Sequence, residues 1–252
     1  MNRPVLRTHA QARAEMREGI LRVGNALLAE HGAAGLSVRA IARELGVASS
    51  ALYRHVASRD ELLTLLLVDA YSELAARVEE ALEGGASGER GGEPDEREGE
   101  PLERGGEPAS AAEALAVLAR AMRGWAVANP AKWALVYGSP VPGYAAPAER
   151  TTGPGTAVLG RFMGMLAADA EEGPVADSGL SEGLDAVLTA GGEELGLRMP
   201  AQRAAQAVEA WTGLVGLISA EVFQQLGPDF AGHGAEMLER WIAGTVSRFA
   251  LC

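Results

Sequence analysis

Five side chains that suit the recognition of a polyanion lie within a short stretch near the N-terminus. The stretch offers two hydroxyls, a phenol, a guanidinium and an imidazole, and these groups hydrogen-bond to phosphate oxygens and base edges. Apolar residues alternate with them at the spacing of one buried helix face. The pattern predicts a short helix that buries Leu52 and Val56 and turns its polar set outward. The polar set consists of Ser49, Ser50, Tyr53, Arg54 and His55.

Other kinds of chemistry find no support in the spacing of the reactive side chains. The four histidines are dispersed, and the single cysteine is Cys252. Neither residue type shows metal-ligand spacing, and the sequence contains no glycine-rich phosphate loop, zinc-protease motif or nucleophile elbow. We therefore expect a protein that is not an enzyme and that uses neither a metal ion nor a cofactor.

The stretch from residue 36 to 63 carries the punctuation that would hold this helix in place. Ser37 is a helix N-cap residue, and apolar residues follow it at helical spacing. Gly46 stands where a tight turn needs a left-handed residue. Ser58 and Glu61 form a capping box at the start of a longer helix. These signals predict a helix-turn-helix followed by a third helix, a unit whose second helix lies in the DNA major groove.

Residues 9–75 resemble the N-terminal DNA-binding domain of the TetR family of transcriptional regulators. The most specific match is the run YRHV at 53–56 followed by SRDEL at 58–62. The resemblance implies that the Tyr and His positions contact phosphates, as does a basic residue opening the fourth helix, here Arg59 instead of the usual Lys. It also implies a homodimeric, ligand-responsive repressor. The predicted DNA contacts are Ser37, Arg39, Ser49, Ser50, Tyr53, Arg54, His55 and Arg59.

A helical protein-interaction domain that does not read DNA is the alternative function, and on spacing alone the unit could also be an ordinary helical hairpin. The outward Tyr53, Arg54 and His55 favour DNA binding, because a recognition helix that had lost its role would not need them. Failure to bind duplex DNA at low salt would favour the interaction domain.

The charge of the chain is unevenly divided. The net charge is −12, yet residues 1–60 carry nine arginines and five acidic residues, which gives that part a net charge of +4. The remainder carries 13 basic and 29 acidic residues and a net charge of −16. Because local charge sets phosphate affinity, this division is compatible with DNA binding through the N-terminal part.

Cysteine usage and hydropathy predict a cytoplasmic protein. A chain with one cysteine forms no internal disulfide and fits a reducing compartment. The sequence also lacks a signal peptide and any apolar run of about 18 residues, so neither export nor a membrane span is expected.

Helical periodicity predicts an all-α fold of about nine or ten helices. We expect a helix-turn-helix domain at 1–58 and a larger helical effector-binding and dimerisation domain at 59–252. Residues 83–108 are rich in Gly and Glu and repeat the hexapeptide ERGGEP, so they are expected to be a disordered acidic linker. The expected helices of the larger domain span 59–82, 110–128, a short segment after Asn129-Pro130, 153–168, 180–189, 201–226 and 230–251.

The last two of these helices are apolar over more than one face, with Pro228 expected to end the first of them. A helix that must face both its own core and a partner has this pattern, so 201–226 and 230–251 are expected to form a homodimer interface. The C-terminal part resembles the WHG type found in actinobacterial members of the family. Val215 stands where that type has its His, which removes a polar group from the ligand contacts that the resemblance implies.

Aromatic and flexible side chains gather in the segments that, by the resemblance, wall a ligand pocket. Few charges interrupt these segments, so we expect an apolar or aromatic small-molecule effector. Plain core packing is the alternative for each residue. The function expected overall is a repressor that such an effector releases from a palindromic operator. The predicted ligand contacts are Trp125, Trp133, Tyr137, Tyr144, Phe162, Met163, Trp211 and Leu214.

Overall fold

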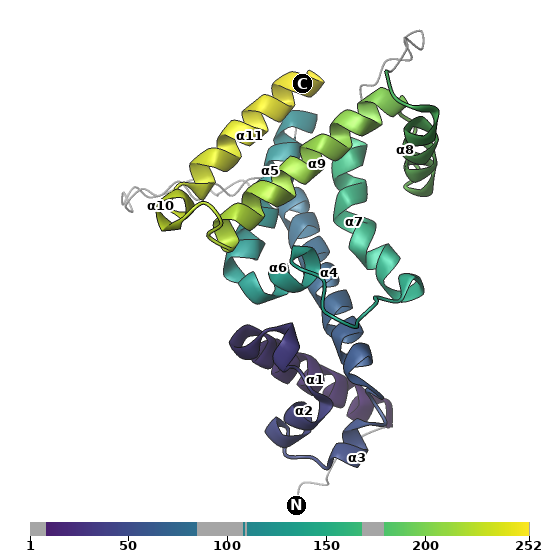
Figure 1. Ribbon diagram of the computed structural model, residues 1–252, viewed down its shortest axis with the longest axis vertical. Coiled ribbons are helices and arrows are strands. Elements are labelled where there is room, and N and C mark those ends of the chain that lie inside the picture. Colours follow the sequence, from purple (N-terminus) through teal and green to yellow (C-terminus); the bar gives the residue numbers. More distant parts are fainter. Residues whose placement is uncertain (1–8, 85–107, 109, 168–178, 252) are drawn as a thin grey trace, which may run out of the picture. The chain divides into compact units, whose positions relative to one another are not determined.

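The computed structural model describes residues 9–84, 108, 110–167 and 179–251, and all of the regular secondary structure in these residues is helical (Figure 1). The all-α fold expected from the sequence is thereby confirmed. The described residues form eleven α-helices and one short 3-10 helix, where nine or ten helices were expected. In chain order they are α1 (His9–His31), η1 (Ala33–Gly35), α2 (Val38–Glu44), α3 (Ser49–Leu52), α4 (Arg59–Glu83), α5 (Ala111–Ala128), α6 (Pro130–Tyr137), α7 (Ala148–Ala167), α8 (Glu182–Glu194), α9 (Ala201–Val222), α10 (Pro228–Ala231) and α11 (Gly234–Phe249).

The chain forms two compact units. The first unit contains residues 1–73 and 129–155, and the second contains residues 74–128 and 156–252. Both α4 and α7 therefore contribute residues to each unit. The domain boundary expected between residues 58 and 59 stays a prediction, and most of the linker expected at 83–108 lies outside the described residues. None of the described helices is both long enough and apolar enough to cross a membrane.

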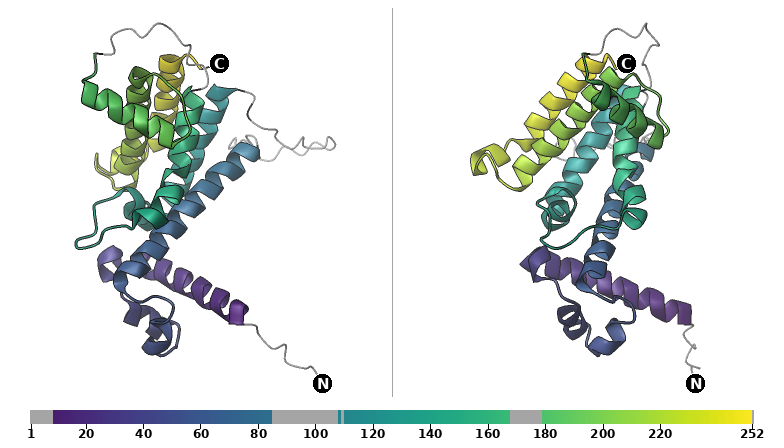
Figure 2. Two further views of the ribbon diagram at one scale, coloured as in Figure 1. Left: turned by 90° about the vertical axis from the view of Figure 1, so that its right-hand side faces the viewer. Right: turned by 45° about the vertical axis from the view of Figure 1, so that its right-hand side comes forward.

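The core of the first unit is built from the apolar faces of α1, α2, α3 and the first half of α4. Ile41, Leu62, Leu63 and Leu66 are completely buried there, and α1 also packs against α6. Gly24 lets α1 approach α4 closely, because a Cβ at this position would lie 2.9 Å from a methyl carbon of Leu66. Figure 2 shows the two helices crossing. This packing anchors the helix-turn-helix to α1 and α4.

The second unit is a helical core in which α5, α9 and α11 pack against one another and α8 packs against α9. Leu115, Leu118, Leu214 and Ile218 are completely buried. The yellow-green α9 and the yellow α11 run side by side in both views of Figure 2. The core therefore joins segments that lie far apart in the sequence.

The C-terminal helices differ from the expected ones. α9 ends at Val222, and Pro228 opens α10 instead of ending α9. The segment expected as one helix over 230–251 is divided into α10 and α11. The early end of α9 follows from the backbone at Gln224, whose φ of 51° is left-handed. A right-handed helix cannot continue through such a residue.

Two helices of the larger expected domain begin or end elsewhere than the sequence indicated. α7 begins at Ala148, five residues before the expected start, and contains Pro154. The Pro147 carbonyl nucleates it by accepting from the Thr151 backbone N–H at 3.1 Å and from the Thr151 hydroxyl at 2.9 Å. α8 runs to Glu194, beyond the expected end at residue 189.

Candidate nucleic-acid interface

The turn between α2 and α3 is held by short-range hydrogen bonds. The Ser37 hydroxyl accepts from the Ala40 backbone N–H at 3.1 Å, so Ser37 is the N-cap of α2 as expected. Gly46 adopts a φ of 66°, a left-handed conformation that a residue with a Cβ would adopt under strain. The backbone N–H of Val47 then donates to the Ala42 carbonyl at 3.0 Å. The chain thus turns sharply after α2 and enters α3 in a fixed direction.

The polar set of the recognition helix is largely on the surface. α3 proper spans only Ser49–Leu52, and a further turn closes where His55 and Val56 donate to the Leu52 carbonyl at 2.8 and 3.0 Å. Leu52 and Val56 are buried, whereas Tyr53 is 44% exposed. Ser50, Arg54 and His55 are also exposed, Ser49 is half-buried, and Arg39 on α2 is exposed. The structure therefore brings the predicted polar face together on one exposed surface of the helix-turn-helix.

Arg59 lies at the start of α4 and is engaged within the protein. Its Nε donates to the Leu36 carbonyl at 3.2 Å, and its Nη2 donates to the Ala33 carbonyl at 2.9 Å. The side chain is half-buried by this arrangement. These bonds tie α4 to the segment that follows α1, so Arg59 positions the unit whether or not it also meets a phosphate. Its predicted phosphate contact stays a prediction.

The start of α4 also carries the expected capping box. The Glu61 backbone N–H donates to the Ser58 hydroxyl at 3.0 Å, and the Glu61 carboxylate accepts from the Ala57 backbone N–H at 2.6 Å. The Glu61 N–H, which the helix start leaves without an intrahelical partner, is thereby satisfied, and so is the N–H of Ala57 just before the N-cap. The box fixes the angle at which α4 leaves the recognition helix.

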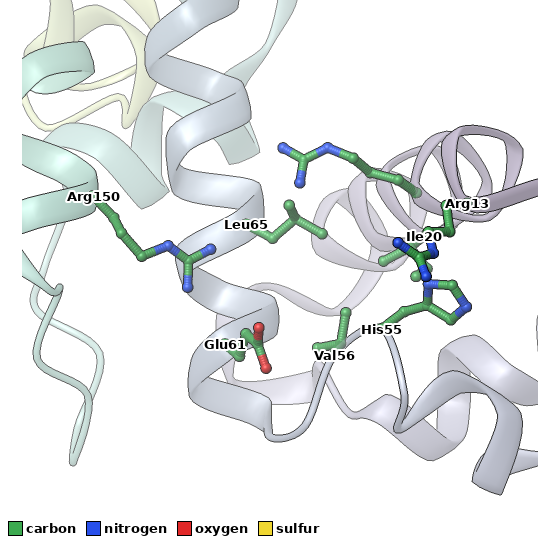
Figure 3. Close-up of a pocket in the computed structure, with 8 residues that line it drawn as sticks. Arg13, Ile20, His55, Val56, Glu61, Leu65 and Arg150 are labelled. Carbon is green, nitrogen blue, oxygen red and sulfur yellow. The ribbon is translucent and has the colours of Figure 1, made fainter. Parts of the chain in front are cut away.

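A cavity of about 200 Å³ adjoins the recognition helix within the first unit. Figure 3 shows Arg13 from α1 beside the His55 ring and Arg150 reaching from α7 toward α4. Arg17 also lines the cavity. Arg150 was not predicted as a site residue, because nothing in the sequence connects this isolated residue of a late helix with the N-terminal helices.

Three of the predicted effector contacts lie in the first unit. Trp133 is completely buried, and its ring centroid lies 4.4 Å from that of Tyr137. Burial raises the pKa of the Tyr137 phenol well above its ordinary value, and the neighbouring Tyr71 adds to the rise. The Tyr144 phenol hydrogen-bonds to the Thr64 hydroxyl at 2.9 Å. Because that hydroxyl donates to the Asp60 carbonyl, the Tyr144 phenol is the donor in the shared bond.

The other predicted effector contacts lie in the second unit. The Phe162 ring centroid lies 5.3 Å from that of Trp211 and 6.2 Å from that of Trp241. Trp241 was assigned from the sequence to the dimer helices alone, and its place in this aromatic cluster emerges only from the fold. Trp125, Met163 and Leu214 are buried in the same unit. The eight residues thus fall into two groups, and their contact with an effector stays a prediction.

A polar chain that sequence reasoning missed links α1, α4 and α6 within the first unit. The Asn25 amide donates to the Asp69 carboxylate at 3.0 Å, and Lys132 on α6 forms ion pairs with Asp69 and Glu73. Lys132 is the only lysine in the chain, but residue counting alone does not reveal its partner. These polar contacts connect α6, which carries Trp133, to α4 and through it to α1.

Sequence comparison finds two family matches in the chain. A family described as bacterial regulatory proteins of the tetR family matches residues 20–66. A second, described as the tetracyclin repressor-like C-terminal domain, matches residues 115–245. The HTH-type transcriptional regulators Mb1846 of Mycobacterium bovis and Rv1816 of Mycobacterium tuberculosis are each 43% identical to this chain, over 86% of it and 85% of their own length.

Solved structures share the fold. The protein SCO4313 superposes with a TM-score of 0.69 at 26% identity, covering 96% of this chain and 100% of its own. A protein from Rhodococcus sp. RHA1 superposes with a TM-score of 0.56 at 20% identity, covering 98% of this chain and 97% of its own. The expectation that the chain is not an enzyme is confirmed, because the matching family and relatives are regulators. The chain belongs to the TetR family of helix-turn-helix transcriptional regulators.

Proposed function

We propose that the protein is a homodimeric repressor that binds a palindromic operator and leaves it when a small apolar or aromatic effector binds. The observation that carries the proposal is the exposed surface of Ser50, Tyr53, Arg54 and His55 above the buried Leu52. A rigid helix with a polar outer face fits the major groove. Ser49, Ser50 and Arg54 are proposed to contact bases or phosphates.

Backbone phosphates are the proposed partners of Ser37, Arg39, Tyr53, His55 and Arg59. The Ser37 hydroxyl accepts within the N-cap, which leaves its own O–H free to donate to a phosphate oxygen. Arg39 is exposed on α2, the helix that crosses the DNA backbone in such a unit. These contacts set the register of the recognition helix without reading sequence.

Dimerisation is proposed to use the outer faces of α9 and α11. The two helices pack together, and their exposed residues include Gly213, Gly216, Ala243 and Gly244. Small residues permit the close approach of a second helix pair, and a two-fold axis would place the same patch on both subunits. Replacing Gly216 by Arg should dissociate the dimer while leaving the subunit folded, since a Cβ there meets nothing within 4 Å.

Analytical ultracentrifugation would report the change. Gly183→Arg on α8 is the matched control, because a Cβ at Gly183 also meets nothing within 4 Å. Dissociation by the control, or a dimer that persists with Gly216→Arg, would count against this interface.

The effector signal is proposed to travel through α4. The chain from Lys132 through Asp69 to Asn25 connects α6, α4 and α1, and two aromatic clusters offer apolar surface for a ligand. An effector that binds one arrangement of α4 better than another shifts the population toward it. A changed spacing of the two helix-turn-helix units in the dimer would then weaken operator binding. We propose the cytoplasm as the compartment in which this occurs.

Selection of bound sequences from a random duplex pool tests the function directly. A palindrome should emerge, and log K for the selected duplex should fall against log salt with a slope near −0.9 for each phosphate contacted. Arg54→Ala should weaken binding by roughly tenfold or more, as expected for a charge-assisted contact. Absence of binding at low salt would instead favour a protein-interaction domain.

The effector is best sought through the four tryptophans of the chain. Apolar and aromatic compounds that change the intrinsic fluorescence should also release the selected duplex. A compound that changes fluorescence but leaves operator affinity unaltered would be a ligand without a regulatory role, and would argue against the proposed coupling.

A further inference from the structure

Among the described residues that line the cavity beside the recognition helix, positive side chains outnumber negative ones. Three arginines line it, namely Arg13, Arg17 and Arg150, together with His55. Its one acidic lining residue is Glu61, whose carboxylate accepts from the Ala57 backbone N–H. Within the described residues, none of the three arginines has an ion-pair partner. All three are exposed, so the cavity is open to solvent.

The placement of these arginines works against helix stability. Arg13 and Arg17 are four residues apart on α1, where like charges repel along one helix face. Arg150 is in the first turn of α7, where the helix dipole favours an acidic residue and disfavours a cation. An anion between the guanidinium groups would offset both unfavourable terms by attraction to the arginines.

We propose that the cavity binds a phosphate group through Arg13, Arg17 and Arg150, with the His55 ring at its edge. Guanidinium groups present paired N–H donors to phosphate oxygens, and a volume of about 200 Å³ accommodates a tetrahedral oxyanion with its remaining water. Arg150, at the start of α7, thereby extends the anion-binding surface that the helix-turn-helix presents.

Two sources can supply the phosphate. One is the backbone of a bound duplex, which rests on the DNA binding proposed above, since His55 follows the recognition helix directly. The other is a free phosphate or phosphorylated metabolite that occupies the cavity in solution. The chemistry of the site is the same in both cases, and the experiment below separates them.

The first measurement uses inorganic phosphate and the full chain without DNA. Phosphate added at constant ionic strength against chloride should raise the melting temperature of the wild type. Arg150→Gln should weaken the apparent affinity roughly tenfold, and Arg150→Lys should restore part of it. Arg22→Gln is the matched control, because Arg22 is exposed on α1 and does not line the cavity.

The second measurement compares the salt dependence of binding to a 30-base-pair random-sequence duplex. If a backbone phosphate occupies the cavity, Arg150→Gln should reduce the slope of log K against log salt by about 0.9, and Arg22→Gln should leave it unchanged. An unchanged slope together with a lost phosphate response identifies a free anion as the occupant. If Arg150→Gln alters neither measurement more than Arg22→Gln does, the proposal is overturned. Failure of the wild type to bind the duplex would refute the proposed function while leaving the phosphate titration interpretable.

Discussion

The helix-turn-helix and the helical core of the second unit are stabilised by polar contacts of very different range. In the helix-turn-helix, Ser37 caps Ala40 three residues away, and the Ser58–Glu61 box closes over three and four residues. In the second unit, bidentate ion pairs span 98 residues between Arg123 and Glu221 and 119 residues between Arg120 and Glu239.

The difference shows which contacts depend on the completed fold. Local caps can form as soon as their own helix forms, and each has a modest effect on stability. A pair that joins α5 to α9 requires the whole core to be assembled. Removing one residue of the pair leaves the charge of the other residue without its counter-charge. Among the polar contacts, a buried long-range pair should therefore contribute more to the stability of the second unit than a local cap contributes to that of the helix-turn-helix.

Arg123→Ala should give the largest loss of stability. The Glu221 side chain is 9% exposed and accepts from Arg123 at 2.6 and 2.8 Å, so the variant would leave a carboxylate buried without its partner. We expect a loss of about 3 kcal/mol in the free energy of unfolding, measured by urea denaturation. Arg120→Ala is the control, since its pair with Glu239 is half exposed and should contribute less than about 1 kcal/mol. Equal losses in both variants would remove the distinction between buried and exposed pairs.

Arg59→Ala tests a contact that joins the start of α4 to the segment after α1. Removing two hydrogen bonds from a charged donor to the carbonyls of Ala33 and Leu36 should destabilise the protein by about 2 kcal/mol. Denaturation curves monitored by far-ultraviolet circular dichroism would measure the loss. The salt dependence of duplex binding shows whether Arg59 also meets a phosphate, because a purely structural role leaves the slope unchanged. A stability equal to that of the wild type would show that these bonds contribute nothing.

Ser37→Ala should have a smaller effect. The substitution removes the acceptor for the Ala40 N–H and should destabilise α2 by about 1 kcal/mol. Hydrogen exchange of the α2 amides would detect this local loss, with the amides of α9 as the internal reference. Ser37→Asp keeps a capping oxygen and should retain most of the protection. If Ser37→Ala reduced the protection of the α2 and α9 amides by the same factor relative to the wild type, the effect would be global and would contradict a local role for the cap.

The smallest expected effect is the pH dependence of the Glu239 pair. The hydrogen bond from Arg120 lowers the pKa of this carboxyl below 4.5, so its contribution to stability is present above pH 4.5 and disappears as the pH falls through the lowered value. Glu239→Gln should cost under about 0.5 kcal/mol at neutral pH, because solvent screens the half-exposed pair. The two denaturation midpoints should converge in acid. A difference between the two midpoints that grows as the pH falls would contradict the prediction.

Much of the fold could be predicted from sequence because its signals are local. Gly46, Ser37 and the Ser58–Glu61 box each act within five residues, and the structure confirms all three. The sites where prediction failed involve backbone states that depend on context. Gln224 ends α9 in a left-handed conformation that its residue type does not favour, so Pro228 was taken for the end of the helix.

The candidate site likewise contains residues that local sequence signals predict and residues that only the fold brings together. The outward Tyr53, Arg54 and His55 follow from helical spacing around Leu52, which is a local argument. The cavity arginines do not follow from it, because Arg150 comes from another helix 95 residues beyond His55. The aromatic side chains were recognised as apolar, yet only their packing separates them into a cluster around Trp133 and another around Phe162.

The sequence by itself determined the helices, their caps, the sharp turn at Gly46 and the membership of the TetR family, because these depend on residue type and spacing within a few turns of helix. The tertiary structure alone decided that Arg123 meets Glu221, that Arg59 ties α4 to the segment after α1, and that Arg150 joins Arg13 at one cavity. Each of these contacts links segments distant in the chain. Such contacts form only once buried apolar surface has fixed the helices against one another, and no local pattern records which partners will then meet.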